Sequence, residues 1–276
     1  MKTKKLFILT AVVSLVFSLL SADYLCAGEN EKIKQWIDEL ADSQKRVVAK
    51  KHLIQAGQRA ASELTGALKD DYLKTSVLIS VIQIIKENEI REAAPVLREL
   101  TSSSRVRIRL ESIRALGAME VHDSADIFKA ALKDVNANIR IAALSSLTEI
   151  RDQSAVPDFI ASLSDLSAGV RLKAAEALSI MSDKSAIPDL IARLNDVNSS
   201  VVIQAIEALS RFKDKEVVAV LVAKLDTTNI KIKVKTIEAL ARIKDKSVLN
   251  LLEPMLKDEF SDVRTVAKAA IKSIEE

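Results

Sequence analysis

The histidine, cysteine and acidic side chains of this chain are poorly placed for catalysis. The 276 residues include two histidines and one cysteine, and His52 and His122 lie far apart along the chain. A metal centre needs several such side chains at short spacings on one helix or loop. The sequence contains no histidine pair on one predicted helix, no Gly-x-Ser-x-Gly and no phosphate-binding glycine loop. We therefore expect no catalytic residue, no metal site and no cofactor, and the protein is predicted not to be an enzyme.

Two clusters of basic residues could bind an anionic partner. One lies around Arg105 and Arg107 in the stretch SSSRVRIRLESIR, and the other is the stretch NIKIKVK with Lys231, Lys233 and Lys235. Neither cluster contains aromatic residues on which nucleic-acid bases could stack. Ordinary solvated charges are the competing interpretation, and a salt-independent binding curve would argue against an anionic partner near Arg105.

The balance of charge also gives little support for nucleic-acid binding. Residues 1–27 hold three of the 41 basic residues and one of the 38 acidic residues, which leaves 38 and 37 in the remainder. A nearly neutral chain lacks the electrostatic attraction that drives binding to phosphate backbones. We expect no nucleic-acid partner.

The N-terminal segment 1–27 has the layout of a secretory signal peptide. Three lysines, Lys2, Lys4 and Lys5, precede an apolar run over 6–20, and small or polar residues follow. This apolar run is short for a helix that crosses a bilayer, so a retained anchor is the weaker alternative. The protein is expected to be exported, into the periplasm or out of the cell, with no membrane span after cleavage.

The exact cleavage site is left open by the sequence. Cleavage after Ala27 or after Ala22 would suit a signal peptidase, and Ala27 leaves residues 28–276 without a cysteine. The residues before Cys26 lack the pattern that lipoprotein processing requires. We take 1–27 as the signal peptide and 28–276 as a single repeat domain.

One pattern recurs along nearly all of the remaining chain. The segment VRLKAAEAL at 170–178 aligns, at one constant step, with IRIAALSSL at 139–147, VVIQAIEAL at 201–209 and IKVKTIEAL at 232–240. A fixed period of this kind indicates stacked structural repeats. With only 5 Gly and 4 Pro, and an abundance of helix-forming residues, these repeats are predicted to be helical.

Each repeat is expected to contain two helices joined by a turn. The first helix of each pair ends at a leucine, which predicts eight pairs, at Leu40, Leu68, Leu100, Leu132, Leu163, Leu194, Leu225 and Leu256. Pro95, Pro157 and Pro188 fall in the first turn of a first helix, where a missing N–H has no cost. Pro254 falls inside a first helix, so a kink or a 3₁₀ turn is predicted there.

The second helix of each pair shows which residues form the core. Val170, Ala174, Ala177, Leu178 and Met181 share one helical face and are predicted to be buried. An aliphatic stripe lies beside this face in successive repeats, at Ile79, Leu110, Ile141, Leu172, Ile203 and Val234. It could be an exposed groove for a partner.

The last repeat favours packing between repeats over an exposed groove. At the corresponding positions beside the core face it carries Thr265, Lys268 and Lys272. Polar residues are expected on a terminal repeat if these positions normally face the next repeat.

The pattern V-R-x-x-A-A-x-A-L, followed by A-x-P-x-L-x-x-x-L-x-D, resembles the short HEAT-like repeats first associated with phycobilin lyases. The resemblance covers residues 31–274. It implies an all-α fold, a right-handed α-solenoid (alpha-alpha superhelix, armadillo-like) of about eight HEAT-like helix pairs. It also implies that the second helices line the concave side.

The resemblance further implies a ladder of Asp and Arg side chains between neighbouring repeats. The Asp lies in the turn within a repeat, and the Arg follows it in the second helix. Complete pairs occur at Asp134/Arg140, Asp165/Arg171 and Asp258/Arg264. Elsewhere one member is missing, and we hypothesise that Asp196 pairs with Lys233 of the next repeat. These residues are predicted to be structural.

A row of polar side chains on successive second helices is the predicted partner-binding surface, and we call it the ridge. Its residues are Glu111, Arg114, Lys173, Glu176, Gln204, Glu207, Arg211, Lys235, Glu238 and Arg242. Glu207 with Arg211 and Glu238 with Arg242 are expected to form ion pairs one helical turn apart. A solubilising helix face is the competing interpretation.

The sequence therefore predicts an exported, non-catalytic protein-protein interaction scaffold that binds another protein or an extended peptide. An accessory subunit of an enzyme complex and a self-associating structural protein are the alternatives. Neither the identity of the partner nor the choice between the ridge and the basic cluster near Arg105 follows from the sequence.

Overall fold

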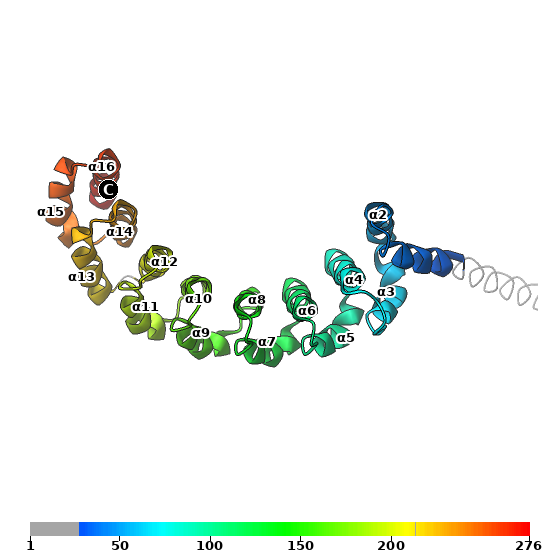
Figure 1. The fold of residues 1–276 in the computed structure, drawn as a ribbon. Coiled ribbons are helices and arrows are strands. Elements are labelled where there is room, and N and C mark those ends of the chain that lie inside the picture. Colours follow the sequence, from blue (N-terminus) through cyan, green and yellow to red (C-terminus); the bar gives the residue numbers. More distant parts are fainter. Residues whose placement is uncertain (1–27, 213) are drawn as a thin grey trace, which may run out of the picture. The chain divides into compact units, whose positions relative to one another are not determined.

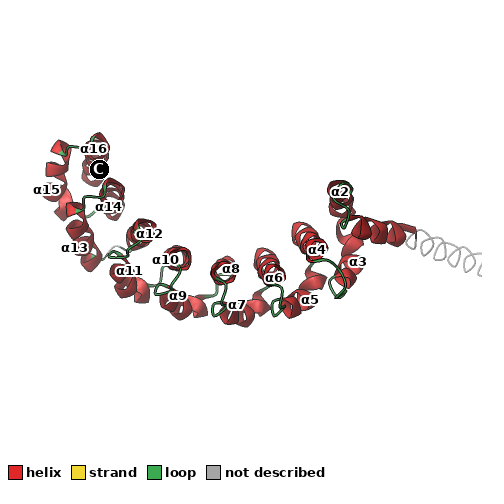
Figure 2. Ribbon diagram, viewed as in Figure 1, coloured by secondary structure: helices red, strands yellow, loops and turns green. Residues whose placement is uncertain are grey.

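The computed structural model describes residues 28–212 and 214–276, and this part of the chain consists of helices and turns without a strand (Figure 2). The all-α prediction is confirmed. The predicted signal peptide lies outside the described residues. The chain divides into two compact units, of which the first ends at Met119 and the second runs from Glu120 to Glu276.

The first unit begins with a helix over 28–39 and continues as helix pairs. Its other helices are α2 (Arg46–Ala56), η1 (Gly57–Ala60), α3 (Ala61–Ala67), α4 (Thr75–Glu87), η2 (Arg91–Ala93), α5 (Ala94–Leu100) and α6 (Val106–Ala118), where η denotes a 3₁₀ helix.

The second unit repeats the same arrangement with greater regularity. Its helices are η3 (His122–Ser124), α7 (Ala125–Ala131), α8 (Ala137–Glu149), η4 (Gln153–Ala155), α9 (Val156–Ser162), α10 (Ala168–Met181), η5 (Lys184–Ala186), α11 (Ile187–Arg193), α12 (Ser199–Leu209), α13 (Lys215–Ala223), η6 (Lys224–Asp226), α14 (Ile230–Ile243), η7 (Lys246–Val248), α15 (Leu249–Leu252), η8 (Glu253–Lys257) and α16 (Ser261–Glu275).

The helices of the second unit form two layers (Figure 1). The second helices α8, α10, α12, α14 and α16 lie in one layer, in which each packs against the next. The first helices α7, α9, α11, α13 and α15 form the other layer, and each contacts the second helix of its own pair. Within this unit the layer of second helices lies on the inner side of the curve (Figure 1).

Proline and aspartate residues determine where the first helices begin. Pro95, Pro157 and Pro188 occupy the first turns of α5, α9 and α11, as predicted. Pro254 lies in the 3₁₀ helix η8, which confirms the prediction of a 3₁₀ turn there. In four turns between repeats an aspartate carboxylate accepts a nearby backbone N–H, at Asp152, Asp183, Asp214 and Asp245.

The core follows the predicted faces of the second helices. In α10, Val170, Ala174, Ala177, Leu178 and Met181 are all buried. One helix pair is too small to cover all of its own apolar side chains. Their burial therefore depends on the neighbouring pairs as well as on the two helices of the pair itself.

The positions beside this core face lie between neighbouring repeats. Ile206 and Ile237 are fully buried, whereas Lys268 at the equivalent position of α16 is exposed. The aliphatic stripe of the second unit is half-buried at Ile141, Leu172, Ile203 and Val234. Ile141 on α8 lies close to Gly169 on α10, which favours packing between repeats, and the half-burial of the stripe leaves the alternative of an apolar groove as a prediction.

The second helices α4, α6, α8, α10 and α14 are each followed, within two residues, by a residue with positive φ. The non-glycine residues with positive φ among those described are Glu89, Glu120, Arg151, Ser182 and Lys244. Gly57 occupies the corresponding place at the end of α2, with φ 59° and ψ −133°. A left-handed residue is the common way to end an α-helix, and only glycine adopts it without steric cost.

Candidate partner-binding surfaces

Ion pairs join neighbouring repeats of the second unit at the turns before the second helices. The Arg140 guanidinium binds the Asp165 carboxylate through two hydrogen bonds of 2.8 and 2.7 Å. Its Nη1 also donates to the backbone oxygens of Asp134 and Val135, at 2.8 and 3.2 Å. One arginine therefore binds backbone oxygens of its own turn and the carboxylate in the turn of the next repeat. The planar guanidinium has enough donors to make both contacts at once.

The following repeats use the same arrangement. Arg171 binds the Asp196 carboxylate at 2.7 and 2.8 Å, and Lys233 Nζ lies 2.9 Å from Asp258 Oδ2. In the last repeat, Arg264 donates to the backbone oxygens of Asp258 and Glu259. The pairing of Asp196 with Lys233 that the sequence suggested is wrong, because each basic residue reaches forward to the acid of the following repeat.

The ladder carboxylates are charged groups with structural partners. The hydrogen bond from Arg171 lowers the pKa of Asp196 against the opposing influence of burial. For Asp165, burial is the largest influence and raises the pKa, but hydrogen bonds from Arg140 and from the Ser167 N–H outweigh it, and the pKa is lowered. Such carboxylates stay ionised at neutral pH and suit scaffolding better than proton transfer.

The ridge contains one cluster that spans two repeats. Lys235 Nζ on α14 lies 2.9 Å from Glu238 Oε2 and 3.5 Å from Glu207 Oε1 on α12. All three side chains are partly exposed, at 38% to 41%. The hydrogen bond to Glu238 raises the pKa of Lys235. These charges are preorganised by one another and remain accessible to a partner.

The ion pairs predicted one turn apart within the ridge are wrong. Glu207 and Glu238 both turn towards Lys235, and Arg242 donates to Ser210 Oγ at 2.8 Å. Arg211 is exposed at the end of α12. The side chains on neighbouring second helices are close enough to compete with contacts along one helix.

The other ridge residues form local pairs. Lys173 lies 3.1 Å from Glu176 on α10, and Gln204 is half-buried on α12. Glu111 and Arg114 form a 3.1 Å pair on α6 and belong to the first unit. Within the second unit, the charged part of the ridge is therefore confined to α10, α12 and α14.

The two basic clusters are largely tied to the scaffold. Arg105 donates to the Leu73 backbone oxygen at 3.2 Å, and Arg109 donates to the backbone oxygens of Ser103 and Ser104. In the other cluster, Lys233 and Lys235 are paired with carboxylates. Arg107 and Lys231 are exposed.

A second surface, which the sequence pattern did not reveal, lies at the turns that carry the ladder. Val135, Leu166 and Val197 directly follow the ladder aspartates Asp134, Asp165 and Asp196, and they are 93%, 99% and 98% exposed. Each is held on its C-terminal side by the Asp side chain, which accepts the N–H of the following residue at 2.7 to 2.9 Å. We call these three residues the aliphatic tips. Their regular spacing can be seen in the sequence, but no sequence feature of a single repeat indicates that these side chains are exposed to solvent.

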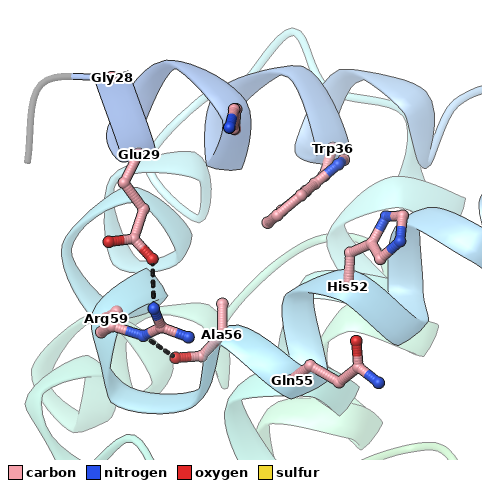
Figure 3. A pocket seen from close by; sticks show the side chains of 8 residues that line it. Gly28, Glu29, Trp36, His52, Gln55, Ala56 and Arg59 are labelled. Atoms are coloured by element: carbon pink, nitrogen blue, oxygen red, sulfur yellow. Dashed lines mark hydrogen bonds and ion pairs between the residues drawn. The ribbon is translucent and has the colours of Figure 1, made fainter. Parts of the chain in front are cut away.

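A pocket of about 530 Å³ lies in the first unit, between the helix over 28–39 and the segment α2 to η1 (Figure 3). The Trp36 and His52 rings meet at one end, with centroids 4.9 Å apart and planes tilted by 38°. At the other end, Arg59 Nη1 lies 2.6 Å from Glu29 Oε1. The only readable signal was that the sole tryptophan and one of the two histidines fall in adjacent predicted helices.

Neither a metal centre nor a membrane-spanning helix is found in the part of the chain that the structure describes. It contains no group of three or more His, Cys, Asp or Glu side chains placed to hold a metal ion. Within the same residues, every helix is too short or too polar to cross a bilayer.

The two-layer stack of helix pairs, tied at the turns by a side-chain ladder, defines an α-solenoid. The family model for HEAT repeats matches residues 125–210 and 187–272, more than half of the chain. The chain therefore belongs to the HEAT-repeat family, as its sequence pattern suggested. No curated protein gives a significant match.

Two solved structures with TM-scores above 0.5 share this fold. The X-ray structure of YibA from Escherichia coli has a TM-score of 0.70 and 23% identity, over 91% of this chain and 96% of that chain. An engineered protein has a TM-score of 0.57 and 17% identity, over 88% and 78%. Human deoxyhypusine hydroxylase in complex with glycerol reaches a TM-score of only 0.40 at 19% identity, over 92% and 98%. For YibA and the engineered protein, the likeness at these identities extends to the fold alone.

Proposed function

We propose that the protein is a non-catalytic scaffold that binds another protein or an extended peptide through the ridge of its second unit. The observation that carries this proposal is the cluster in which Lys235 bridges Glu207 and Glu238 across two repeats. The cluster is ordered by its own contacts, so engaging it costs a partner little entropy. Charges arranged in this way contribute more to specificity and association rate than to raw affinity.

The repeat architecture supports the same function. Stacked repeats present extended surfaces on which side chains recur at one-repeat intervals. Ridge residues on α10, α12 and α14 lie on the layer of second helices, where an elongated partner could contact several repeats at once (Figure 1). The aliphatic tips are the competing surface, because exposed apolar rows also mark interaction sites.

The test is capture of a partner by the tagged protein from the cell envelope of its native host, after chemical cross-linking in cells. The decisive variant is the charge swap E207K/K235E/E238K, which keeps opposite charges adjacent but inverts their signs. A partner that binds the ridge should be lost in this variant, whereas the melting temperature should be close to wild type. The control E216K changes the net charge by the same two units at an exposed glutamate elsewhere in the second unit and should retain the partner.

The same experiment separates the alternatives. If the charge swap retains the partner and V135S/L166S/V197S loses it, the partner binds the aliphatic tips. This result would contradict binding through the ridge. A change of oligomeric state in the charge swap, measured by light scattering, would indicate self-association. Recovery of an enzyme as the captured chain would identify an accessory subunit.

Export is part of the proposal and rests on the sequence of residues 1–27. Mass spectrometry of the protein purified from fractionated cells should show a chain that begins at Gly28 or at Asp23, recovered outside the cytoplasm. A chain that begins at Met1 in the cytoplasmic fraction would contradict export.

A further inference from the structure

The pocket of the first unit has a chemistry that the scaffold does not require. It lies between the helix over 28–39 and α2, and Trp36 points into it from the former (Figure 3). Its volume of about 530 Å³ is in the range of sites for small organic ligands. Trp36 is the one large apolar side chain among the residues that line the pocket, so an aromatic ring at an open pocket is the feature to explain.

One end of the pocket is suited to a flat ring. The half-buried Trp36 packs against His52, with ring centroids 4.9 Å apart. His52 Nδ1 is buried without a hydrogen-bond partner, so packing against Trp36 positions this ring and Nδ1 does not anchor it. A tryptophan at the edge of a cavity offers a large apolar face, and offset stacking of a ligand ring on it is favourable.

The other end of the pocket is suited to an anion. Arg59 is positioned by Glu29, at 2.6 Å, and by the backbone oxygen of Ala56, which accepts its Nε–H at 3.3 Å. These contacts use two of the five guanidinium N–H donors and leave others for a ligand. Lys32 also lines the pocket and is exposed. Lys32 and Arg59 outweigh Glu29 by one positive charge.

We propose that this pocket binds a small organic anion that carries a flat ring, such as an aromatic carboxylate or sulfonate. The ring lies against Trp36, and the anionic group contacts Lys32 and Arg59. Charge-assisted hydrogen bonds to arginine give orientation as well as affinity. This site lies outside the ridge and is independent of the proposed scaffold function.

The experiment uses the single tryptophan as a reporter. Because Trp36 is the only one in the chain, its fluorescence reports on the pocket alone. The probes are 8-anilinonaphthalene-1-sulfonate, which has a flat ring system and a sulfonate, and N-phenyl-1-naphthylamine, which has the same rings without the charge. We expect saturable quenching of Trp36 by the sulfonate at one site, and binding of the neutral analogue weaker by about tenfold or more, as for loss of a charged hydrogen bond.

Variants locate the site. K32Q/R59Q should bind the sulfonate no more tightly than the neutral analogue. The matched control K34Q removes a lysine of the same helix that lies outside the pocket and pairs with Glu31, and it should bind like wild type. Circular dichroism and melting of all variants test that the fold is retained. Equal affinity for the two probes, unchanged binding by K32Q/R59Q, or quenching that does not saturate would overturn the proposal.

Discussion

The two units differ in how their repeats are tied together. In the second unit the same kind of ion pair recurs, formed by Arg140, Arg171 and Lys233 with the acid of the following repeat. In the first unit the contacts between helix pairs are of mixed kinds. Arg59 pairs with Glu29 and Lys50 with Glu87, and other contacts use backbone oxygens. Arg105 donates to the Leu73 backbone oxygen, and Gln58 donates to the Asn88 backbone oxygen.

This difference indicates which unit of the protein can carry a binding site that is not part of the repeat pattern. Similar ladder contacts recur in the second unit, as bidentate pairs at Arg140 and Arg171 and as a single contact at Lys233. The first unit departs from the pattern, with a shorter first spacing between Leu40 and Leu68. It also carries the sole tryptophan, in an open pocket. Side chains that a strict repeat would place in the core are free there to line a cavity.

The largest effect is expected when a ladder arginine is removed. Arg171→Met leaves Asp196, whose side chain is 3% exposed, without its bidentate partner. A buried charge left in this way should lower the free energy of unfolding by about 2–4 kcal/mol. Arg105→Met removes only a contact to a carbonyl and should cost about 1 kcal/mol. Urea unfolding followed by circular dichroism measures both. Equal losses would mean that the ladder is no stronger than the neutral contacts.

Acid should weaken the second unit through the ladder aspartates. The pKa of Asp165, Asp196 and Asp258 is lowered in the folded protein. Their contribution to stability is therefore complete above the ordinary aspartate value of 3.8 and is lost as the pH falls through the lowered folded values. Unfolding free energies measured from neutral pH into strong acid should show this decline. The decline should be smaller in Arg171→Met, and an identical pH profile would contradict the assignment.

Substitutions at the ends of two second helices, one in each unit, should change stability in opposite directions. Gly57 has a backbone conformation that only glycine adopts easily, so Gly57→Ala should destabilise the protein by about 1–2 kcal/mol. Ser182 has φ 56° and ψ 32° at the equivalent place in the second unit, so Ser182→Gly should stabilise it by up to about 1 kcal/mol. Melting temperatures and urea midpoints check both signs. Two changes in the same direction would be inconsistent with this explanation.

The smallest effect on stability is expected for the ridge. The charge swap E207K/K235E/E238K preserves opposite charges at partly exposed positions, so the free energy of unfolding should change by less than about 0.5 kcal/mol. Single Lys235→Glu should cost more, because three like charges then meet. A large loss in the swap would show that the ridge is part of the scaffold, and it would no longer be a surface free to bind a partner.

Several features could be predicted because they depend on one helix pair. The burial of Val170 and Leu178 follows from the period of the α-helix, and the start of α9 at Pro157 follows from the missing N–H of proline. The 3₁₀ helix at Pro254 follows from the same property. The polar residues of α16 agree with the burial of Ile206 and Ile237 at the equivalent positions of α12 and α14, since Lys268 itself is exposed.

The sequence by itself determined the repeat period, the helical fold and the buried faces, because each of these depends on residues that are close along the chain. The tertiary structure alone decided which acid each ladder residue reaches, that Lys235 on α14 meets Glu207 on α12, and that Trp36 meets His52 beside a pocket. These contacts join residues of different helices. They depend on how neighbouring helices are offset, and a difference of one helical turn would have exchanged the partners.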